Sequence, residues 1–300
     1  MEFIGSPDPQ TKAQTYDGER VPFMPTRKLR ITVDKDKVIK NGTVLPEMAN
    51  QVVDYIDVDL TKTNFMKSDI MLLDFIATNA WDLPIYFSVT SGQDEYQNLG
   101  VYLQQEGLAY RLVPVKNPMP GGGDDQRVAT DIMYNNMMTK FRWGKLDQNE
   151  SYVDFVLSNQ SQNLRSVFQK LARQLIIEGK NDQARKVVEK CIEVIPERNV
   201  PYNFYMVPLI DIYFRSGGKD KAAPLASHVA DILIEELNFY SKVKNSDLPA
   251  VQGEIQRNLL GLRTLVQIGQ EQNIPALVSK IQPRMDAFQQ RFAIFDQQQQ

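Results

Sequence analysis

Apolar residues recur at steps of three and four positions along the segment from Arg165 to Pro196, and they do so in two runs. Gly179 and Asn181 interrupt the pattern between the runs, and Pro196 stops the second one. This spacing predicts two amphipathic helices joined by a short turn. Such helices must fold back on one another so that both apolar stripes are buried. The apolar positions are Phe168, Leu171, Ala172, Leu175, Ala184, Val187, Val188 and Cys191.

The same helix–glycine–helix pattern returns towards the C-terminus. A second pair of helices is predicted over Pro201 to Arg215 and Asp220 to Tyr240, with Gly217-Gly218 between them. A third and longer pair is predicted over Leu248 to Gly269 and Ile274 to Phe295. In spacing, the first pair resembles a tetratricopeptide unit of about 34 residues. We therefore expect an array of tetratricopeptide-like helical hairpins over residues 158–296, with Ser158 as the first N-cap and the last hairpin as a terminal cap.

The pattern is different before residue 120, where short stretches of apolar residues alternate with charged ones. It predicts a small α/β domain over residues 21–120, after a flexible N-terminal segment over residues 1–20. With the helical array, the fold class is α+β. The predicted strands are Val21 to Pro25, Leu29 to Val33, Tyr55 to Leu60, Ile85 to Thr90 and Leu108 to Val115. The predicted helices are Asp34 to Lys40, Pro46 to Val53, a helix capped by Ser68 that ends near Asn79, and Asp94 to Gln105.

A loop and a connecting helix are expected over residues 121–157. The glycines at 121–123 lack the Lys-Ser/Thr pair of a phosphate-binding loop, so a hinge or surface loop is favoured. Asp124 or Asp125 is expected to cap a helix that contains Val128 and Phe141 and is ended by Gly144. The glutamines at 297–300 predict a disordered tail.

Composition narrows the function classes. The net charge of −3 argues against nucleic acid as a partner, and one cysteine cannot form an internal disulfide. The lone histidine, His228, excludes most zinc sites and histidine-based triads. The sequence has neither an apolar run long enough to cross a bilayer nor a signal-peptide pattern. We therefore expect no metal, no cofactor and no catalytic residue, and the chain itself is not expected to span a membrane.

One pair of carboxylates leaves an alternative open. Asp57 and Asp59 fall on one face of a predicted strand, as metal or nucleotide-sugar chemistry requires. The solvated face of an edge strand explains them as well and is favoured. His228 and Cys191 are interpreted as structural residues, and Met133, Met137 and Met138 as core packing or, alternatively, a groove for a partner helix.

Three segments carry a family resemblance: Ile76 to Thr90, Leu103 to Pro114 and Met133 to Gly144. They resemble the C-terminal soluble part of DUF2723 membrane proteins of Bacteroidetes, a family similar to protein O-mannosyltransferases. The resemblance covers about Phe3 to Pro201 and implies a longer membrane glycosyltransferase whose spanning, catalytic half precedes this chain. It implies a location on the periplasmic face of the inner membrane and contact with the transmembrane half. A polypeptide acceptor or a glycan is the other implied partner.

The matching segments contain aromatic, amide, acidic and basic residues of the kinds that bind sugars or peptides. The candidate binding residues are Trp81, Tyr86, Glu106, Tyr110, Arg111, Asn136, Arg142 and Trp143. Alternatively, Glu106 and Arg111 pair internally while Trp81 and Trp143 fill the core.

Three functions therefore stay open. The first is a non-catalytic accessory domain of a membrane glycosyltransferase, and the second is an independent scaffold of tetratricopeptide type that binds proteins. The third is a carbohydrate-active hydrolase that uses Asp57 and Asp59, which requires both carboxylates to converge in a pocket.

Overall fold

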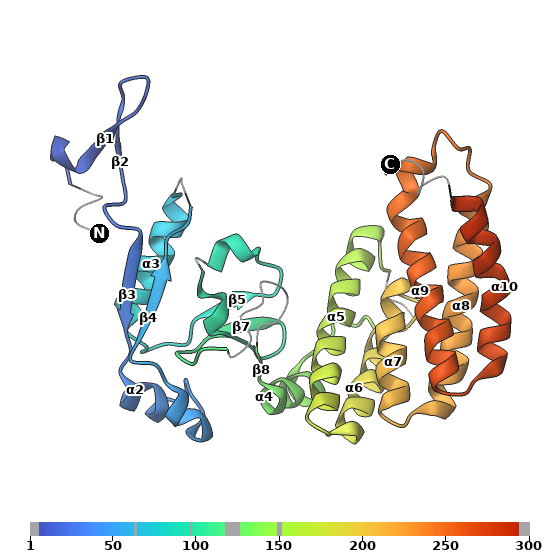
Figure 1. Ribbon diagram of the computed structural model, residues 1–300. Coiled ribbons are helices and arrows are strands. Elements are labelled where there is room, and N and C mark those ends of the chain that lie inside the picture. Colours follow the sequence, from blue (N-terminus) through green and yellow to red (C-terminus); the bar gives the residue numbers. More distant parts are fainter. Residues whose placement is uncertain (1–5, 63–64, 97, 118–126, 149–151, 294–300) are drawn as a thin grey trace. The chain divides into compact units, whose positions relative to one another are not determined.

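The computed structural model describes residues 6–62, 65–96, 98–117, 127–148 and 152–293 (Figure 1). The chain divides into two compact units, Met1–Ala129 and Thr130–Gln300. The described part of the first unit combines short strands with helices, whereas that of the second is built from helices. The fold is therefore α+β, as the sequence predicts.

The first unit begins with two small antiparallel sheets. Strands β1 (Lys12–Gln14) and β2 (Arg20–Pro22) pair in a hairpin, and β3 (Lys28–Thr32) pairs with β4 (Tyr55–Asp59). Helix α2 (Lys35–Lys40) and a 3₁₀-helix (Pro46–Gln51) lie between β3 and β4 in the sequence. Residues alternate between buried and exposed along β4, so this sheet has one core face and one solvent face.

A four-stranded sheet follows in the order β5-β7-β6-β8. Its strands are β5 (Tyr86–Ser88), β6 (Leu103–Gln105), β7 (Ala109–Leu112) and β8 (Arg127–Val128). All neighbouring pairs are antiparallel except β6 and β8, which are parallel. Helix α3 (Lys67–Asn79) contributes Leu73 and Ile76 to a hydrophobic cluster that also contains residues of β4, β5, β6 and β7.

Several predicted boundaries in this unit are wrong. Ser68 does not cap α3, because the helix begins at Lys67 and Ser68 lies inside its first turn. The residue before the helix is Met66, and its backbone N–H donates to the side chain of Asp69 at 2.9 Å. The helix predicted over Asp94 to Gln105 is two 3₁₀ turns, Gln93–Tyr96 and Leu99–Tyr102, followed by β6. Asn98, between the turns, has a left-handed backbone (φ 63°) that an α-helix cannot continue through.

The connecting region also differs from the prediction. Val128, which is expected inside a helix, lies in β8, so the prediction is wrong at the start of that helix. Helix α4 covers Thr130–Asn135 and continues as a π-helical turn over Asn136–Lys140. The glycines at 121–123 and the predicted caps Asp124 and Asp125 lie outside the described residues.

The second unit continues with helices α5 to α10. Consecutive helices pack as α5 with α6, α7 with α8 and α9 with α10, and α5 also packs on α7 (Figure 1). The helices are α5 (Phe155–Ile177), α6 (Asn181–Val194), α7 (Val207–Arg215), α8 (Lys219–Ser241), α9 (Gln252–Glu271) and α10 (Pro275–Phe292). Ser158 is not the first cap, because α5 begins at Phe155 and Asp154 accepts the backbone N–H of Leu157.

The first of these helix pairs follows directly from the apolar spacing. Leu171 and Ala172 on α5, and Ala184 and Val188 on α6, are completely buried. Gly179 has φ 74° at the turn, a left-handed conformation that favours glycine and ends α5. The sequence prediction of two helices that bury facing stripes is therefore confirmed.

Arg165 is the least expected residue in this core. Its side chain lies on α5, and the residue is only 1% exposed. The guanidinium donates to the backbone carbonyls of Ile195, Val200 and Pro201, in the connection between α6 and α7, and to the side chain of Gln162. Burial lowers the pKa of Arg165 from its ordinary value. This one side chain therefore supplies donors to three carbonyls of an irregular segment, and Nε2 of Gln162 also donates to the carbonyl of Pro201, at 3.3 Å.

Cys191, on α6, makes the stability of the helical unit vary with pH in the alkaline range. Burial raises the pKa of its thiol from 9.0 to about 12, although the nearby charge of Arg165 acts in the opposite direction. A folded-state pKa above the unfolded-state value of 9.0 means that this contribution to stability is complete at pH values well below 9.0. It is lost as the pH rises towards 12, at up to about 1.4 kcal/mol per pH unit.

We therefore expect Cys191→Ala to flatten the pH dependence of unfolding between pH 9 and the folded-state pKa of about 12. Urea unfolding of both proteins, followed by far-ultraviolet circular dichroism at several pH values, measures this difference. The tyrosines titrate in both proteins, so their contribution to the pH dependence of unfolding cancels when the two proteins are compared. Equal pH slopes for the two proteins would contradict the assignment.

Candidate functional site

Polar side chains from four strands share one face of the β5-β7-β6-β8 sheet. The strand register places Tyr86 opposite Arg111, Arg111 opposite Gln104, and Gln104 opposite Arg127. Glu106 follows β6 two positions after Gln104, so it lies on the same face. We call these five residues the polar sheet face.

Glu106 is the centre of the polar sheet face. It is only 7% exposed, and both of its carboxylate oxygens accept hydrogen bonds. The hydroxyl of Tyr86 donates to Oε2 at 2.9 Å, and the amide of Gln104 donates to Oε1 at 2.7 Å. Nη1 of Arg111 lies 3.7 Å from Oε1, which makes an ion pair without a hydrogen bond.

The two arginines of this face have few strong acceptors. Arg127 donates through Nη2 to the side-chain oxygen of Gln104, and its Nη1 contacts the sulfur of Met48 at 3.3 Å. Burial lowers the pKa of Arg127, and the charge of Glu106 only partly opposes this effect. Nε of Arg111 is buried and has no hydrogen-bond partner among the described residues.

Tyr86 forms the exposed end of the network. Its residue is 48% exposed, and the guanidinium carbon of Arg111 lies 5.9 Å from the centre of its ring. The pKa of Tyr86 is raised first by partial burial and then by its hydrogen bond to Glu106, so the phenol stays protonated at neutral pH. Because the protein already occupies both oxygens of Glu106, this arrangement suits binding better than proton transfer.

The other predicted binding residues lie elsewhere. Trp81 is buried in the core of the first unit, and its indole N–H donates to the carbonyl of Thr32 at 3.1 Å. Tyr110 points to the opposite, apolar face of the sheet, where its ring packs edge-on against Tyr96. The structure therefore brings together Tyr86, Glu106 and Arg111, but not Trp81 and Tyr110.

The last three predicted residues belong to the second unit. Asn136 begins the π-helical turn after α4, and Arg142 is exposed. Trp143 packs against Phe168 of α5, with the ring centres 4.9 Å apart. In the alternative prediction, Glu106 and Arg111 pair internally while Trp81 and Trp143 fill the core. The positions of Glu106, Arg111 and Trp81 agree with it, whereas Trp143 is only partly buried.

Sequence reasoning missed Gln104 and Arg127. Gln104 and Glu106 are two positions apart, so they would lie on the same face of a strand. This relation was missed because the segment up to Gln105 is predicted to be a helix. Arg127 comes into register with Gln104 through the parallel pairing of β8 with β6, which no local pattern reveals.

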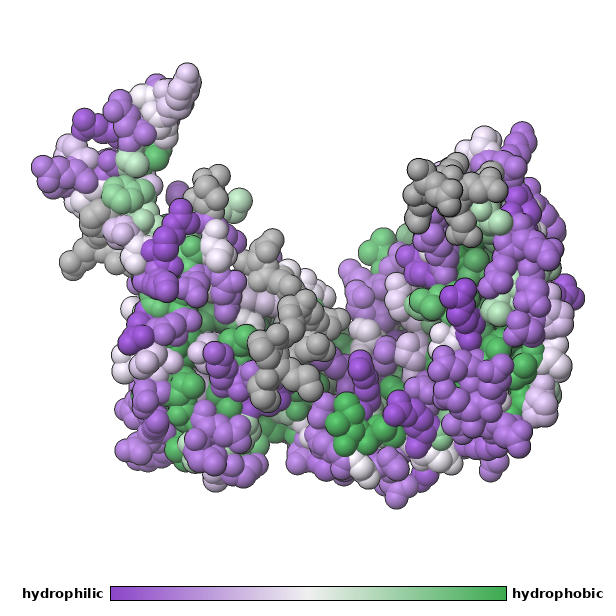
Figure 2. Space-filling view, in the orientation of Figure 1, coloured by the Kyte–Doolittle hydropathy of each residue, from purple (hydrophilic) through white to green (hydrophobic). Residues whose placement is uncertain are grey.

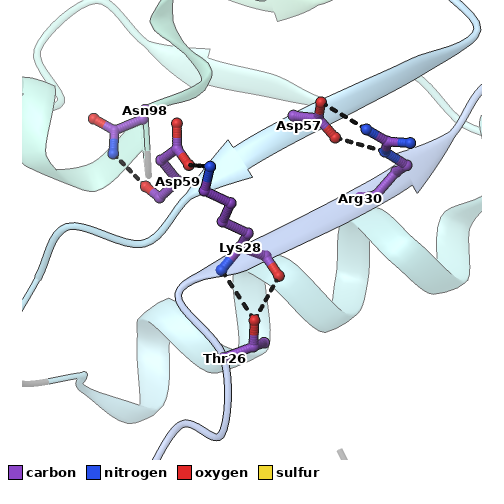
Figure 3. Close-up of polar contacts among 6 residues, drawn as sticks. All are labelled: Thr26, Lys28, Arg30, Asp57, Asp59 and Asn98. Carbon is purple, nitrogen blue, oxygen red and sulfur yellow. Dashed lines mark hydrogen bonds and ion pairs between the residues drawn. The ribbon is translucent and has the colours of Figure 1, made fainter.

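The carboxylates of Asp57 and Asp59 do not form a pocket. Both lie on the solvent face of the β3–β4 sheet, with 53% and 66% of their side chains exposed. Asp57 accepts two hydrogen bonds from Arg30, at 2.7 and 3.0 Å, and Asp59 lies 4.0 Å from Nζ of Lys28 (Figure 3). The solvated-face interpretation is therefore confirmed, and the hydrolase hypothesis loses the carboxylate pair on which it was based.

The remaining candidates for chemistry are structural. The side chain of His228 is half exposed and contacts Glu197 at 2.7 Å, and the raised pKa of Cys191 makes its thiol a poor nucleophile. Among the described residues, no three His, Cys, Asp or Glu side chains gather as metal ligands. No helix in the described ranges is long and apolar enough to cross a membrane. The helices of the second unit show a mainly hydrophilic surface on the visible side (Figure 2).

Residues 1–132 match the family model of TMEM260-associated domain 2. The match covers the first unit and the first residues of α4, and its name indicates a membrane-protein context for this part of the chain. No curated protein matches the chain. No solved structure matches it either.

Proposed function

We propose that this chain is a non-catalytic, water-facing accessory domain of a multi-spanning membrane glycosyltransferase of the O-mannosyltransferase type. The match of residues 1–132 to TMEM260-associated domain 2 is the observation that carries the proposal. The resemblance of three segments to the periplasmic part of DUF2723 proteins adds the glycosyltransferase class and the periplasmic location. In this role the chain binds an acceptor protein or braces the membrane half of the enzyme.

The positions of the carboxylates support a binding role. Glu106 is hydrogen-bonded at both oxygens, and Asp57 and Asp59 lie beside cations in solvent. Neither arrangement presents the two facing carboxyl groups that glycoside hydrolysis uses.

The helical unit supports the acceptor-binding part of the proposal. Its successive helices pack in pairs, and we propose that these pairs form a tetratricopeptide-like array in which alternate helices line one surface. A groove of about 670 Å³ lies between α7 and α9. Phe204, Leu260 and Ile268 supply apolar contacts there, and Arg215 and Glu271 supply charges of both signs. Such a mixture suits a short polypeptide segment.

Fractionation of the cells that make this protein tests the proposal. An antibody raised against the chain should detect a polypeptide much larger than 34.3 kDa that stays in the membrane after alkaline carbonate extraction. The large mass is expected because the described helices cannot themselves anchor the chain. A known peripheral protein, which carbonate should release, is the control.

The same experiment separates the alternative. If the antigen has a mass near 34 kDa and is released with the peripheral control, the accessory-domain proposal is wrong. The groove between α7 and α9 would then favour an independent scaffold that binds proteins.

A further inference from the structure

We propose that Arg111 and Arg127 form a binding site for an oxyanion, either a phosphate or a carboxylate group of a ligand, while Tyr86 and Gln104 hold Glu106 beside them. The site is the polar sheet face of the first unit, where the register of four strands gathers these side chains. The inference does not depend on the membrane role proposed above.

Charge balance is the first argument. The polar sheet face holds two guanidinium groups and one carboxylate, so it has one positive charge in excess among the described residues. Only 14% of the Arg111 side chain and 7% of the Glu106 side chain are exposed, which means that water screens this charge poorly. A buried excess charge is costly, and a bound anion would remove that cost.

Hydrogen-bonding capacity is the second argument. Arg111 has five N–H donors, but its ion pair with Glu106 is 3.7 Å long, and its buried Nε has no acceptor among the described residues. Among the described residues, the acceptors of Arg127 are a neutral amide oxygen and a thioether sulfur. Arginine donors of this kind match the oxygen pairs of phosphate and carboxylate groups.

Geometry and access are the third argument. Arg111 and Arg127 lie on the two strands that flank β6, and both approach the Gln104–Glu106 pair, so their side chains converge. Tyr86 is half exposed at one end of the network, and Arg127 is partly exposed at the other. A small ligand can therefore reach the arginines from solvent, while the donors of Tyr86 and Gln104 hold Glu106 in place.

Calorimetric titration of the whole 300-residue chain tests this site. Inorganic phosphate and acetate are titrated separately, against sodium chloride at equal ionic strength. We expect saturable binding of at least one of the two anions, and the anion that binds identifies the ligand chemistry. Arg111→Gln should weaken that binding at least about tenfold, because it removes the charge and most of the donors.

Arg30→Gln is the matched control, since Arg30 is an exposed arginine on the other sheet and pairs with Asp57. Its anion affinity should equal that of the unmodified protein. Arg127→Gln provides a second variant on another strand, in case Arg111→Gln does not fold. The melting temperature should also rise with anion concentration in the unmodified protein, and less so in either site variant.

Two results would overturn the proposal. One is the absence of saturable binding for both phosphate and acetate. The other is a loss of binding in Arg30→Gln as large as that in the site variants, which would show a general charge effect. Because all measurements use the isolated chain, failure here leaves the membrane proposal untouched, and the fractionation result in turn does not affect this site.

Discussion

Arg165→Ala is expected to lower the free energy of unfolding of the helical unit by about 3–5 kcal/mol. The substitution removes a buried guanidinium that donates to the carbonyls of Ile195, Val200 and Pro201. The carbonyls of Ile195 and Val200 would lose this buried donor, whereas that of Pro201 would keep its hydrogen bond from Gln162, and the small alanine side chain would leave a cavity. The connection between α6 and α7 should therefore loosen before the helices themselves separate.

Urea unfolding, followed by far-ultraviolet circular dichroism, measures the effect. Labelling of Cys191 with a thiol reagent adds a local reading, because this cysteine is the only one in the chain and is buried on α6. Arg173→Ala is the control, since it removes an exposed arginine from the same helix and should change stability by no more than about 0.5 kcal/mol. Equal losses in the two variants would contradict the role given to Arg165.

Trp81→Ala is expected to destabilise the first unit by about 3–5 kcal/mol, the usual cost of removing a large buried aromatic side chain. Trp81 is 6% exposed and belongs to the core shared by the two larger sheets, where its indole also binds the carbonyl of Thr32. Hydrogen exchange followed by mass spectrometry should show faster exchange in β3 and β4, and little change in α8 and α9 of the second unit.

Tyr16→Ala is the matched control, because Tyr16 is a fully exposed aromatic residue of the same unit. Its exchange pattern should equal that of the unmodified protein. If Trp81→Ala left hydrogen exchange unchanged but abolished binding of a sugar or peptide, the core assignment would be wrong. The sequence-based prediction of Trp81 as a binding residue would then gain support.

The sequence predicts the elements whose information is local. The spacing of Leu171, Ala172, Ala184 and Val188 identifies two helices and their buried faces, and Gly179 identifies the turn between them. Strands β3 and β4 are also recognisable, since alternation of apolar and polar residues is a period-two signal within a few positions. In each case the residues that determine the element lie within about one helical turn, or within a few positions along a strand, of one another.

The candidate site could be predicted only in part. Tyr86, Glu106 and Arg111 are candidates because they lie in the segments that carry the resemblance and have side chains suited to binding. The same two grounds apply to Trp81 and Tyr110. Residue type does not say which face of a sheet a side chain occupies, and a shift of one residue in register exchanges the two faces. For this reason the sequence could not separate the polar sheet face from the apolar face that contains Tyr110.

Only the tertiary structure decided the long-range contacts. The register of β6 with β7 and β8 brings Gln104 and Arg127 to Glu106, and the fold of the α6–α7 connection brings three carbonyls to Arg165. It also set Asp57 beside Arg30 in solvent. The sequence by itself determined the longer helices and many of the strands, because those depend on neighbouring residues, but it wrongly predicts a helix over Asp94 to Gln105. The partners of the charged side chains come from segments distant in the chain, so folding alone selects them.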